Sequence, residues 1–444
     1  MAQVLPSPGV ESHPFHQNTK DGNVSSFSPG APSSMSVPRT LPSLLYHHHH
    51  HQHHHLSTPS SSNTSSASDM LDIRSSSTSL LDTLDTQTLS SLLQPPGRKS
   101  LPSLLLWDEK GQSLYDSILA TPSYYPYRVE NALLQKQIGH IASTIASSTT
   151  DILVELGAGN LSKTALLLSA LDQCLEDSSS SGSSRAGLKK MVYYALDVDH
   201  TLLSSSLHQL RKHTAPALKN IELRSLLGTY EDGARWLSQP DLAPYRKTMV
   251  WLGNSIANYE KDEASDLLAK FTTCSQNGYG MQNLAGFLLG VDGCLDQEKV
   301  ERAYNAPGGE NRRWVLHALE AAGEQLQLQP RDSDMFDEKN WKFEGRWDGE
   351  RQRYENYLVP KRKLEAVVTC KGGKKVPLVL EEGEKVFVLG SGKWTARDVQ
   401  GICEGPGLKL KKSWHSEGDD YGVYWLQPGK KRLDSGIEME EDEE

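Results

Sequence analysis

The middle of the chain alternates short apolar runs with stretches in which apolar residues recur at helical spacing. The apolar runs predict strands at 152–156, 192–198, 220–224, 248–252 and 285–291. The helical spacing predicts helices at 162–171, 202–212 and 263–274. Strands separated by helices need crossover connections, so this pattern predicts an α/β fold built on a doubly wound parallel sheet.

The pattern differs on both sides of this region. Before it, helices are expected at 79–93, 112–119 and 131–146, with an aromatic turn at 122–127. After it come two expected helices, 297–304 and 312–326, and then expected antiparallel strands at 341–347, 353–360, 365–370, 375–380, 385–389 and 421–427. Gly372-Gly373 would form a hairpin turn. A second, α+β domain is therefore predicted, and the Ser/Gly-rich stretch 177–185 is expected to be a surface loop.

Composition separates these regions from two tails. Residues 1–70 are mostly Ser, Pro, Thr, Asn and His with few aliphatic residues, and residues 431–444 are acidic, so both are expected to be disordered. The histidines of 47–55 could bind a metal, but a low-complexity tract is favoured because nothing around them sets a coordination geometry. The expected units are a helical segment, 71–150, a Rossmann-like core, 151–296, and an α+β domain, 297–430.

Charge and cysteine usage exclude several classes of protein. The chain has 444 residues with 46 Lys+Arg against 56 Asp+Glu, a net charge of −10, which argues against a nucleic-acid partner. No stretch approaches the ~20 apolar residues of a membrane span. The five cysteines are scattered and form no C-x-x-C, and the N-terminus lacks a secretory signal. We therefore expect a cytoplasmic protein, a monomer, without a membrane or nucleic-acid partner.

The most informative motif is Glu155-Leu-Gly157-Ala-Gly159, at the end of the first strand of the core. Glycines allow the backbone to turn sharply and approach a ligand with no Cβ in the way. No Gly-Lys-Ser/Thr follows, which excludes a P-loop, and Ser162 stands where a dinucleotide fingerprint has its third glycine. An acidic residue before two glycines suits S-adenosylmethionine, because its sulfonium and amino groups are cationic and it has no pyrophosphate.

The next strand ends at Asp197, where a doubly wound fold places a carboxylate that accepts hydrogen bonds from ribose hydroxyls. The alternative is structural: Gly157 and Gly159 form only a tight turn and Asp197 is a cap. Strand, glycines, helix, strand and terminal aspartate occur in the required order, which favours a nucleoside cofactor.

The chain resembles the histidine-specific methyltransferase family, which includes enzymes of ergothioneine synthesis and fungal dimethylallyltryptophan N-methyltransferases. The matching stretches are 71–74, 101–111, 124–130, 153–164, 194–199, 227–233, 251–258, 290–304, 414 and 421–422. The resemblance implies a class I methyltransferase-like fold with a second domain that binds the substrate. It also implies S-adenosylmethionine as the cofactor and a small-molecule amine as the partner.

The resemblance further implies roles for individual residues. The residues that would line the cofactor site are Glu155, Gly157, Gly159, Lys163 and Asp197, with Gly228, Thr229 and Tyr230 near the adenine. Tyr124 and Asn258 would hold the acceptor amine as catalytic residues, and Tyr304 would reach the acceptor's carboxylate. Each also has a structural alternative: turn packing for Tyr124, a helix cap for Asn258 and a core position for Tyr304. Methyl transfer to nitrogen needs no Lewis acid, so no metal site is expected.

Two departures from the family bear on the acceptor. In the family's histidine enzymes a glutamate and a serine bind the imidazole, and here Leu389 stands in place of that glutamate although Ser391 is present. An unpaired imidazole N–H would cost about 1–3 kcal/mol. Trp107 also replaces a tyrosine that binds carboxylate. We therefore expect an N-methyltransferase for an amino acid, or an amine derived from one, that is bulkier and more apolar than histidine, such as an indole. Histidine Nα-methylation and a non-catalytic cofactor-binding scaffold remain alternatives.

Overall fold

A computed structural model describes residues 70–74, 80–159, 161–180, 190–272, 283–370, 373–418 and 420–429. The two tails expected to be disordered, 1–70 and 431–444, lie outside these residues apart from Met70. The histidine tract at 47–55 and residue 430 also lie outside them.

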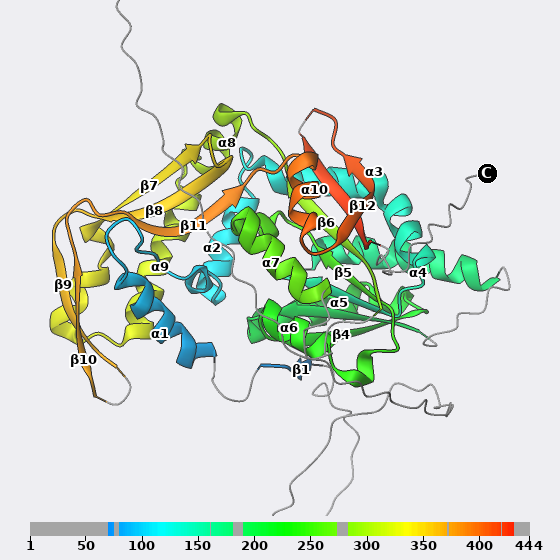
Figure 1. The fold of residues 1–444 in the computed structure, drawn as a ribbon, viewed down its shortest axis with the longest axis horizontal. Coiled ribbons are helices and arrows are strands. Elements are labelled where there is room, and N and C mark those ends of the chain that lie inside the picture. The colour runs from blue at the N-terminus through cyan, green and yellow to red at the C-terminus, as the bar shows by residue number, and fades with distance from the viewer. Residues whose placement is uncertain are drawn as a thin grey trace, which may run out of the picture. The chain divides into compact units, whose positions relative to one another are not determined.

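A large mixed sheet forms the centre of the described part (Figure 1). Six strands run parallel in the order β1 (Met70–Asp72), β4 (Ile221–Leu227), β3 (Met191–Asp197), β2 (Ile152–Leu156), β5 (Lys247–Trp251) and β6 (Leu284–Asp292). β13 (Tyr421–Pro428) pairs antiparallel with β6, and β12 (Leu408–His415) pairs antiparallel with β13. The predicted doubly wound parallel sheet is confirmed.

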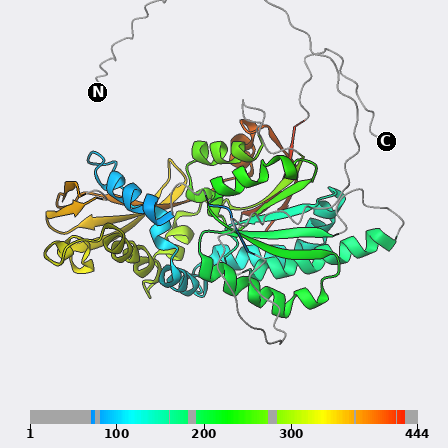
Figure 2. The same ribbon diagram turned by 90° about the horizontal axis from the view of Figure 1, so that it is seen from below.

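Helices cover both faces of this sheet (Figure 2). On one face, α3 (Tyr125–Ser147), α4 (Ser162–Ser180) and α5 (His200–His213) share a buried cluster with β2, β3 and β13. On the other, Trp236 of α6 (Tyr230–Leu237) packs on Tyr194, and Phe271 of α7 (Lys261–Thr272) packs on Phe287. Because successive side chains of a strand point to opposite faces, adjacent strand residues pack under different helix layers.

The strand order reverses between β2 and β5, which are neighbours in the sheet but not in the chain. In a doubly wound sheet, the connections that leave two such strands run to opposite faces, and a crevice opens beyond their carboxyl ends. Gly157 follows β2 and Leu252 follows β5 at this edge. The topology therefore predicts the place of the ligand site independently of any motif.

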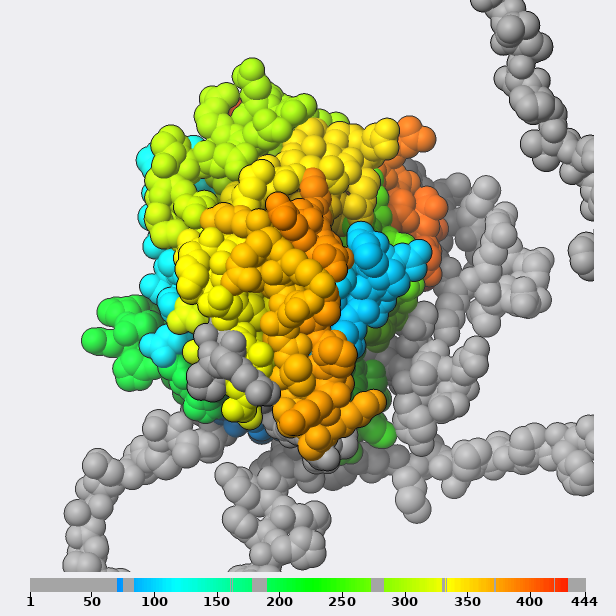
Figure 3. Space-filling view, turned by 90° about the vertical axis from the view of Figure 1, so that its left-hand side faces the viewer, coloured from blue at the N-terminus to red at the C-terminus, as the bar shows by residue number. Residues whose placement is uncertain are grey.

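A smaller α+β part is inserted between β6 and α10 (Ala396–Glu404) of the central unit. It contains α8 (Gln297–Tyr304), α9 (Glu310–Leu326), a sheet of β7 (Trp341–Asp348), β8 (Arg353–Pro360) and β11 (Val386–Gly392), and a hairpin of β9 (Leu364–Thr369) and β10 (Lys375–Leu380). All its strand pairs are antiparallel, as expected. Figure 3 shows this part in yellow and orange beside the blue N-terminal segment.

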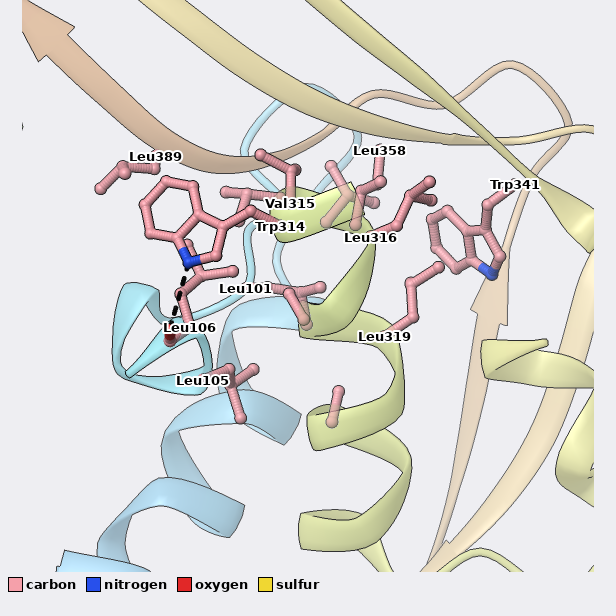
Figure 4. Close-up of a cluster of buried hydrophobic side chains, with 14 of the residues drawn as sticks. Leu101, Leu105, Leu106, Trp314, Val315, Leu316, Leu319, Trp341, Leu358 and Leu389 are labelled. Carbon is pink, nitrogen blue, oxygen red and sulfur yellow. Dashed lines mark hydrogen bonds between the residues drawn. The ribbon is translucent and has the colours of Figure 1, made fainter. Parts of the chain in front are cut away.

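The N-terminal helices pack on this inserted part. α1 (Leu80–Leu92), α2 (Glu109–Leu119) and the 3-10 helix η1 (Ser103–Leu106) all contact α9. The other 3-10 helices are η2 (Ala215–Ala217), η3 (Pro240–Leu242), η4 (Ser255–Asn258), η5 (Pro330–Phe336) and η6 (Glu338–Asn340). A buried cluster joins these elements, and in it the Trp314 indole N–H donates a hydrogen bond of 3.3 Å to the Leu106 carbonyl (Figure 4).

Several elements differ from the expected ones. α3 begins at Tyr125 rather than 131, since Pro126 is favourable in a first helical turn, so only 122–124 of the expected aromatic turn lies outside the helix. α4 continues to Ser180 through the first residues of the expected loop, whose remainder lies outside the described residues. The elements that were not predicted are β1, α6, α10 and β12. A register shift at Leu410/Lys412 interrupts the apolar alternation of β12.

The division into units at 150/151 and 296/297 stays a prediction, but the central sheet extends beyond the predicted core. β12 and β13 lie within 297–430 and pair into the central sheet, and β1 precedes 151. The predicted substrate-binding range therefore contains two parts with different sheet partners.

Gly286 of β6 tests the packing of the C-terminal strand on the central sheet. A Cβ at this position would lie 2.5 Å from the Trp425 ring, so Gly286→Ala must displace the indole or the backbone. We expect a loss of about 1–3 kcal/mol in the free energy of unfolding, measured by denaturant titration. Gly139→Ala is the matched control, because Gly139 is exposed on α3 with nothing within 4 Å of its Cβ position. That variant should gain about 0.5–1 kcal/mol, and equal effects of the two variants would contradict the packing argument.

Candidate functional site

A cavity of about 490 Å³ lies at the carboxyl edge of the central sheet. Its walls come from the loops after β2, β3, β4 and β5, from the N-terminal segment, and from β11. The predicted residues that line it are Trp107, Tyr124, Glu155, Gly157, Gly159, Lys163, Asp197, Gly228, Thr229, Tyr230, Asn258 and Leu389. Tyr304 and Ser391 do not line it and lie behind its wall.

The glycine bend after β2 faces the end of β3. Gly157 has a φ of +68° and Gly159 a φ of +55°, both in the left-handed region that favours glycine. The Gly157 amide donates to the Leu196 carbonyl at 3.0 Å, and the Gly159 amide donates to Asp197 Oδ2 at 3.2 Å. A Cβ at Gly157 would lie 2.7 Å from the Tyr230 hydroxyl oxygen. The bend is therefore close-packed on one side and held against the Asp197 carboxylate on the other.

Two carboxylates at this edge are held by hydrogen bonds. Glu155 Oε2 accepts from the hydroxyls of Thr164 at 2.6 Å and Tyr193 at 2.7 Å. Burial raises the pKa of Glu155, and these two hydrogen bonds oppose the shift. Burial likewise raises the pKa of Asp197, against backbone amides that stabilise its charged form. Their orientations are thus determined before any ligand binds.

Glu130 is a site residue that the sequence analysis did not single out. It is fully buried on α3 and lines the cavity. Its Oε1 accepts from the Gly253 amide at 2.7 Å and the Tyr421 hydroxyl at 2.8 Å, and its Oε2 forms an ion pair with Lys163. One carboxylate therefore connects the helix after the glycine bend, the loop after β5, and β13. Its position within the matched stretch 124–130 was the only signal in the sequence.

Thr229 and Tyr230 lie at the start of α6. The Thr229 hydroxyl and the Asp232 carboxylate form a capping box, which determines where the helix begins. The Tyr230 ring packs on Trp251 with centroids 4.7 Å apart, and burial raises the pKa of its hydroxyl. Gly228 donates its amide to the Asp197 carbonyl at 3.0 Å, so this loop also lies against the end of β3.

The end of the cavity formed by the N-terminal segment and β11 is largely apolar. Trp107 and Tyr115 pack edge to face with centroids 5.1 Å apart, and Trp314 packs 5.3 Å from Trp107 behind them. Leu389 of β11 lines the cavity and belongs to the same buried cluster as Trp314 (Figure 4). Tyr115 was not predicted as a site residue. It lies on α2, the helix that begins two residues after Trp107.

Tyr124 occupies the N-cap position of α3, where its ring is buried and packs edge to face on Tyr304 at 5.6 Å. Burial raises the pKa of both hydroxyls. Tyr304 also stacks on Tyr354 at 4.5 Å, and its hydroxyl lies 2.7 Å from Ser391 Oγ. Tyr304 thus has the core packing expected of its structural alternative, and its ring contacts Tyr124, which lines the cavity.

A buried polar network continues behind Tyr304. Lys393 Nζ donates to the Tyr304 hydroxyl at 3.1 Å and pairs with Asp292 at 2.9 Å, both charged side chains being fully buried. The Tyr125 hydroxyl donates to Asp292 Oδ2 at 2.7 Å. A buried charge is tolerated only when paired and hydrogen-bonded, and this pair is. Neither Lys393 nor Asp292 was singled out from the sequence, although Asp292 lies within the matched stretch 290–304.

Asn258 is the last residue of η4 and lines the cavity. α7 begins only at Lys261, and the Ala264 amide donates to the Glu260 carbonyl at 2.8 Å. Glu260 therefore has the cap position, which removes the helix-cap alternative for Asn258.

Within the described residues, no three His, Cys, Asp or Glu side chains are grouped as a metal ion would require. None of the described helices is both long and apolar enough to cross a membrane.

Comparison with known proteins adds to this geometry. A family profile described as histidine-specific methyltransferase, SAM-dependent, matches residues 84–428. N-methyltransferase imqF of Aspergillus flavus is 36% identical over 324 residues, spanning 73% of this chain and 80% of that protein. N-methyltransferase fsqC of Aspergillus fumigatus is also 36% identical over 324 residues, spanning 73% and 78%. 4-dimethylallyltryptophan N-methyltransferase easF of Claviceps purpurea is 28% identical over 371 residues, spanning 81% and 99%.

The profile covers more than half of the chain, and the relatives are matched over most of their lengths. The expected enzyme class, the S-adenosylmethionine cofactor and the class I methyltransferase-like fold are confirmed. The chain belongs to the family of histidine-specific, S-adenosylmethionine-dependent methyltransferases.

Proposed function

We propose that this N-methyltransferase acts on the amine of an aromatic amino acid, or of a small molecule derived from one, that is bulkier and more apolar than histidine. The observation that carries the proposal is the composition of the cavity: a glycine bend and fixed carboxylates at one end, and Trp107, Tyr115 and Leu389 at the other. An imidazole would find no acceptor at Leu389, whereas an indole would replace water on an apolar wall.

The residues at the sheet edge fit the cofactor. The left-handed glycines leave the backbone of the bend open beside Asp197, and a Cβ at Gly159 would meet nothing within 4 Å. Asp197 would accept hydrogen bonds from ribose hydroxyls, and Glu155 and Lys163 would hold the charged amino-acid end. Tyr230 and Thr229 would lie against the base. When bound, S-adenosylmethionine supplies a methyl group already activated by its sulfonium.

The remaining residues would orient the acceptor. The Asn258 carbonyl oxygen and the Tyr124 hydroxyl are neutral, so they can direct a nitrogen lone pair without stabilising the ammonium form. Holding the amine at near-attack distance away from bulk water is the main requirement of an in-line displacement. Tyr304 and Ser391 would act from behind through Tyr124 and through their bonds to Lys393. The proton released from the amine would pass to water.

Other properties support a small-molecule substrate. The relative from Claviceps purpurea is named for a prenylated tryptophan, which fits an apolar acceptor end. The net charge of −10 disfavours a polyanionic partner. We therefore propose a cytoplasmic monomer that needs neither nucleic acid nor a membrane.

Asp197→Asn tests the cofactor site. The new side-chain amide has one oxygen acceptor where the carboxylate has two. Its NH₂ group would therefore either face the Gly159 amide, which is also a donor, or leave a ribose hydroxyl without its acceptor. We expect S-adenosylmethionine to bind about 10- to 100-fold more weakly in calorimetry. Glu176→Gln, which alters an exposed carboxylate on α4, is the control and should bind as the wild type does. Unchanged affinity in the Asp197 variant would contradict the assigned site.

Leu389→Glu tests the acceptor preference. Wild-type protein is incubated with S-adenosylmethionine and equal amounts of tryptophan, tryptamine and histidine, and methylated products are quantified by mass spectrometry. We expect the wild-type enzyme to methylate the two indoles. In the variant, the ratio of kcat/KM for the indoles to kcat/KM for histidine should fall about tenfold or more, because a buried carboxylate pairs an imidazole N–H. Leu389→Met is the matched control and should keep the wild-type preference. Preference for histidine by the wild-type enzyme would overturn the proposal.

A further inference from the structure

Arg353 is a buried cation outside the cavity. It begins β8, its surface is only 2% exposed, and it does not line the cavity. Burial of a guanidinium is costly unless the group is paired and hydrogen-bonded. Its Nη1 pairs with the Glu260 carboxylate, and its Nη2 donates to the backbone carbonyl of Asn258 at 3.2 Å. The guanidinium thus forms an ion pair with Glu260 and a hydrogen bond with the backbone of Asn258.

The same guanidinium lies against the backbone of β11. A Cβ at Gly390 would lie 1.6 Å from Arg353 Nη2, so this position tolerates only glycine while the guanidinium is there. Gly390 lies between Leu389, which lines the cavity, and Ser391, which bonds the Tyr304 hydroxyl. Arg353 therefore contacts both the turn that ends at Asn258 and the strand that carries the apolar wall.

The turn that presents Asn258 has little structure of its own. η4 is a four-residue 3-10 helix, Ser255–Asn258, entered through Asn254 at a left-handed φ of +61°. The Asn254 side chain donates to the Gly392 carbonyl at 3.3 Å, which ties the start of the turn to β11. Arg353 ties the end of the turn to the same strand. The other ties of this turn lie before Asn258: the hydrogen bonds of Asn254 and Ser255, and the burial of Ile256 and Ala257.

We propose that Arg353 is a positioning residue for methyl transfer: it holds Asn258 and the Leu389–Ser391 segment at a set separation across the acceptor end of the cavity. This inference rests on the proposed role of Asn258. It predicts an effect on turnover rather than on cofactor affinity. Gly157 follows β2 and Asp197 ends β3, whereas the guanidinium bonds Glu260 and Asn258.

Arg353→Met tests this role with Arg351→Met as the matched control. Both arginines pair with Glu260, but Arg351 is about half exposed and its other partner is Glu355 instead of Asn258. We expect kcat with the best indole acceptor to fall at least about tenfold in Arg353→Met, since small misplacements at a reacting group cost up to about 100-fold. Arg351→Met should stay within about twofold of wild type, and both variants should bind S-adenosylmethionine as wild type does in calorimetry.

Arg353→Lys separates positioning from loss of folding. Lysine keeps the buried charge but is a point donor that cannot serve Glu260 and the Asn258 carbonyl in the planar manner of arginine. We expect it to fold with a near-native thermal midpoint, to recover part of the lost kcat, and to remain at least about threefold below wild type.

Equal losses of kcat in the two methionine variants would overturn the inference alone. Wild-type kcat in both Arg353 variants, while the wild-type enzyme methylates indoles, would do the same. A loss of cofactor affinity in Arg353→Lys as large as its loss of turnover would also overturn it. Failure of the wild-type enzyme to methylate any amine of the panel would overturn the proposed function, and this inference with it.

Discussion

The hydrogen bond from the Gly159 amide to the Asp197 carboxylate is the contact around which the site is arranged. It joins the connection that leaves β2 to the end of β3, at the edge where the strand order reverses. The glycine bend is possible because both glycines adopt positive φ, and the carboxylate is held because three backbone amides donate to it. Tyr230 lies against Gly157 and Gly228 bonds Asp197, so both are placed by the same two connections. Glu155, within β2, is held by Tyr193 of β3 and Thr164 of α4.

The end of the cavity lined by Trp107, Tyr115 and Leu389 has a different origin. It is built where the inserted part, between β6 and α10, meets the N-terminal helices and the loop after β5. Its wall is aromatic and aliphatic, while a fully buried ion pair, Lys393–Asp292, lies directly behind Tyr304. An apolar surface backed by a satisfied polar network can exclude water from an amine and still orient hydroxyl groups toward it.

Buried charges connect the elements that carry the site. Glu130 accepts hydrogen bonds from the loop after β5 and from β13, and forms an ion pair with α4. Arg353 links η4 to β11. Such groups are expensive to bury, and each has charged or hydrogen-bonding partners on elements far apart in the chain, although Nε of Arg353 has no hydrogen-bond partner among the described residues. They explain how loops with little regular structure are held in place at the edge of the cavity.

Local patterns in the sequence were sufficient to predict most of the helices and strands and the cofactor motif. The apolar run at Ile152–Leu156, the helix Gln297–Tyr304 and the strands Arg353–Pro360 and Lys375–Leu380 have the predicted bounds, because burial imposes a period that the chain displays locally. The fold was needed to show that β12 and β13 pair into the central sheet and that Tyr304 lies behind the cavity wall. It was also needed to show that Glu130 and Arg353 connect elements distant in the chain. Periodicity reports that a face is buried but not against what, so partners distant in the chain become known only when the fold brings them together.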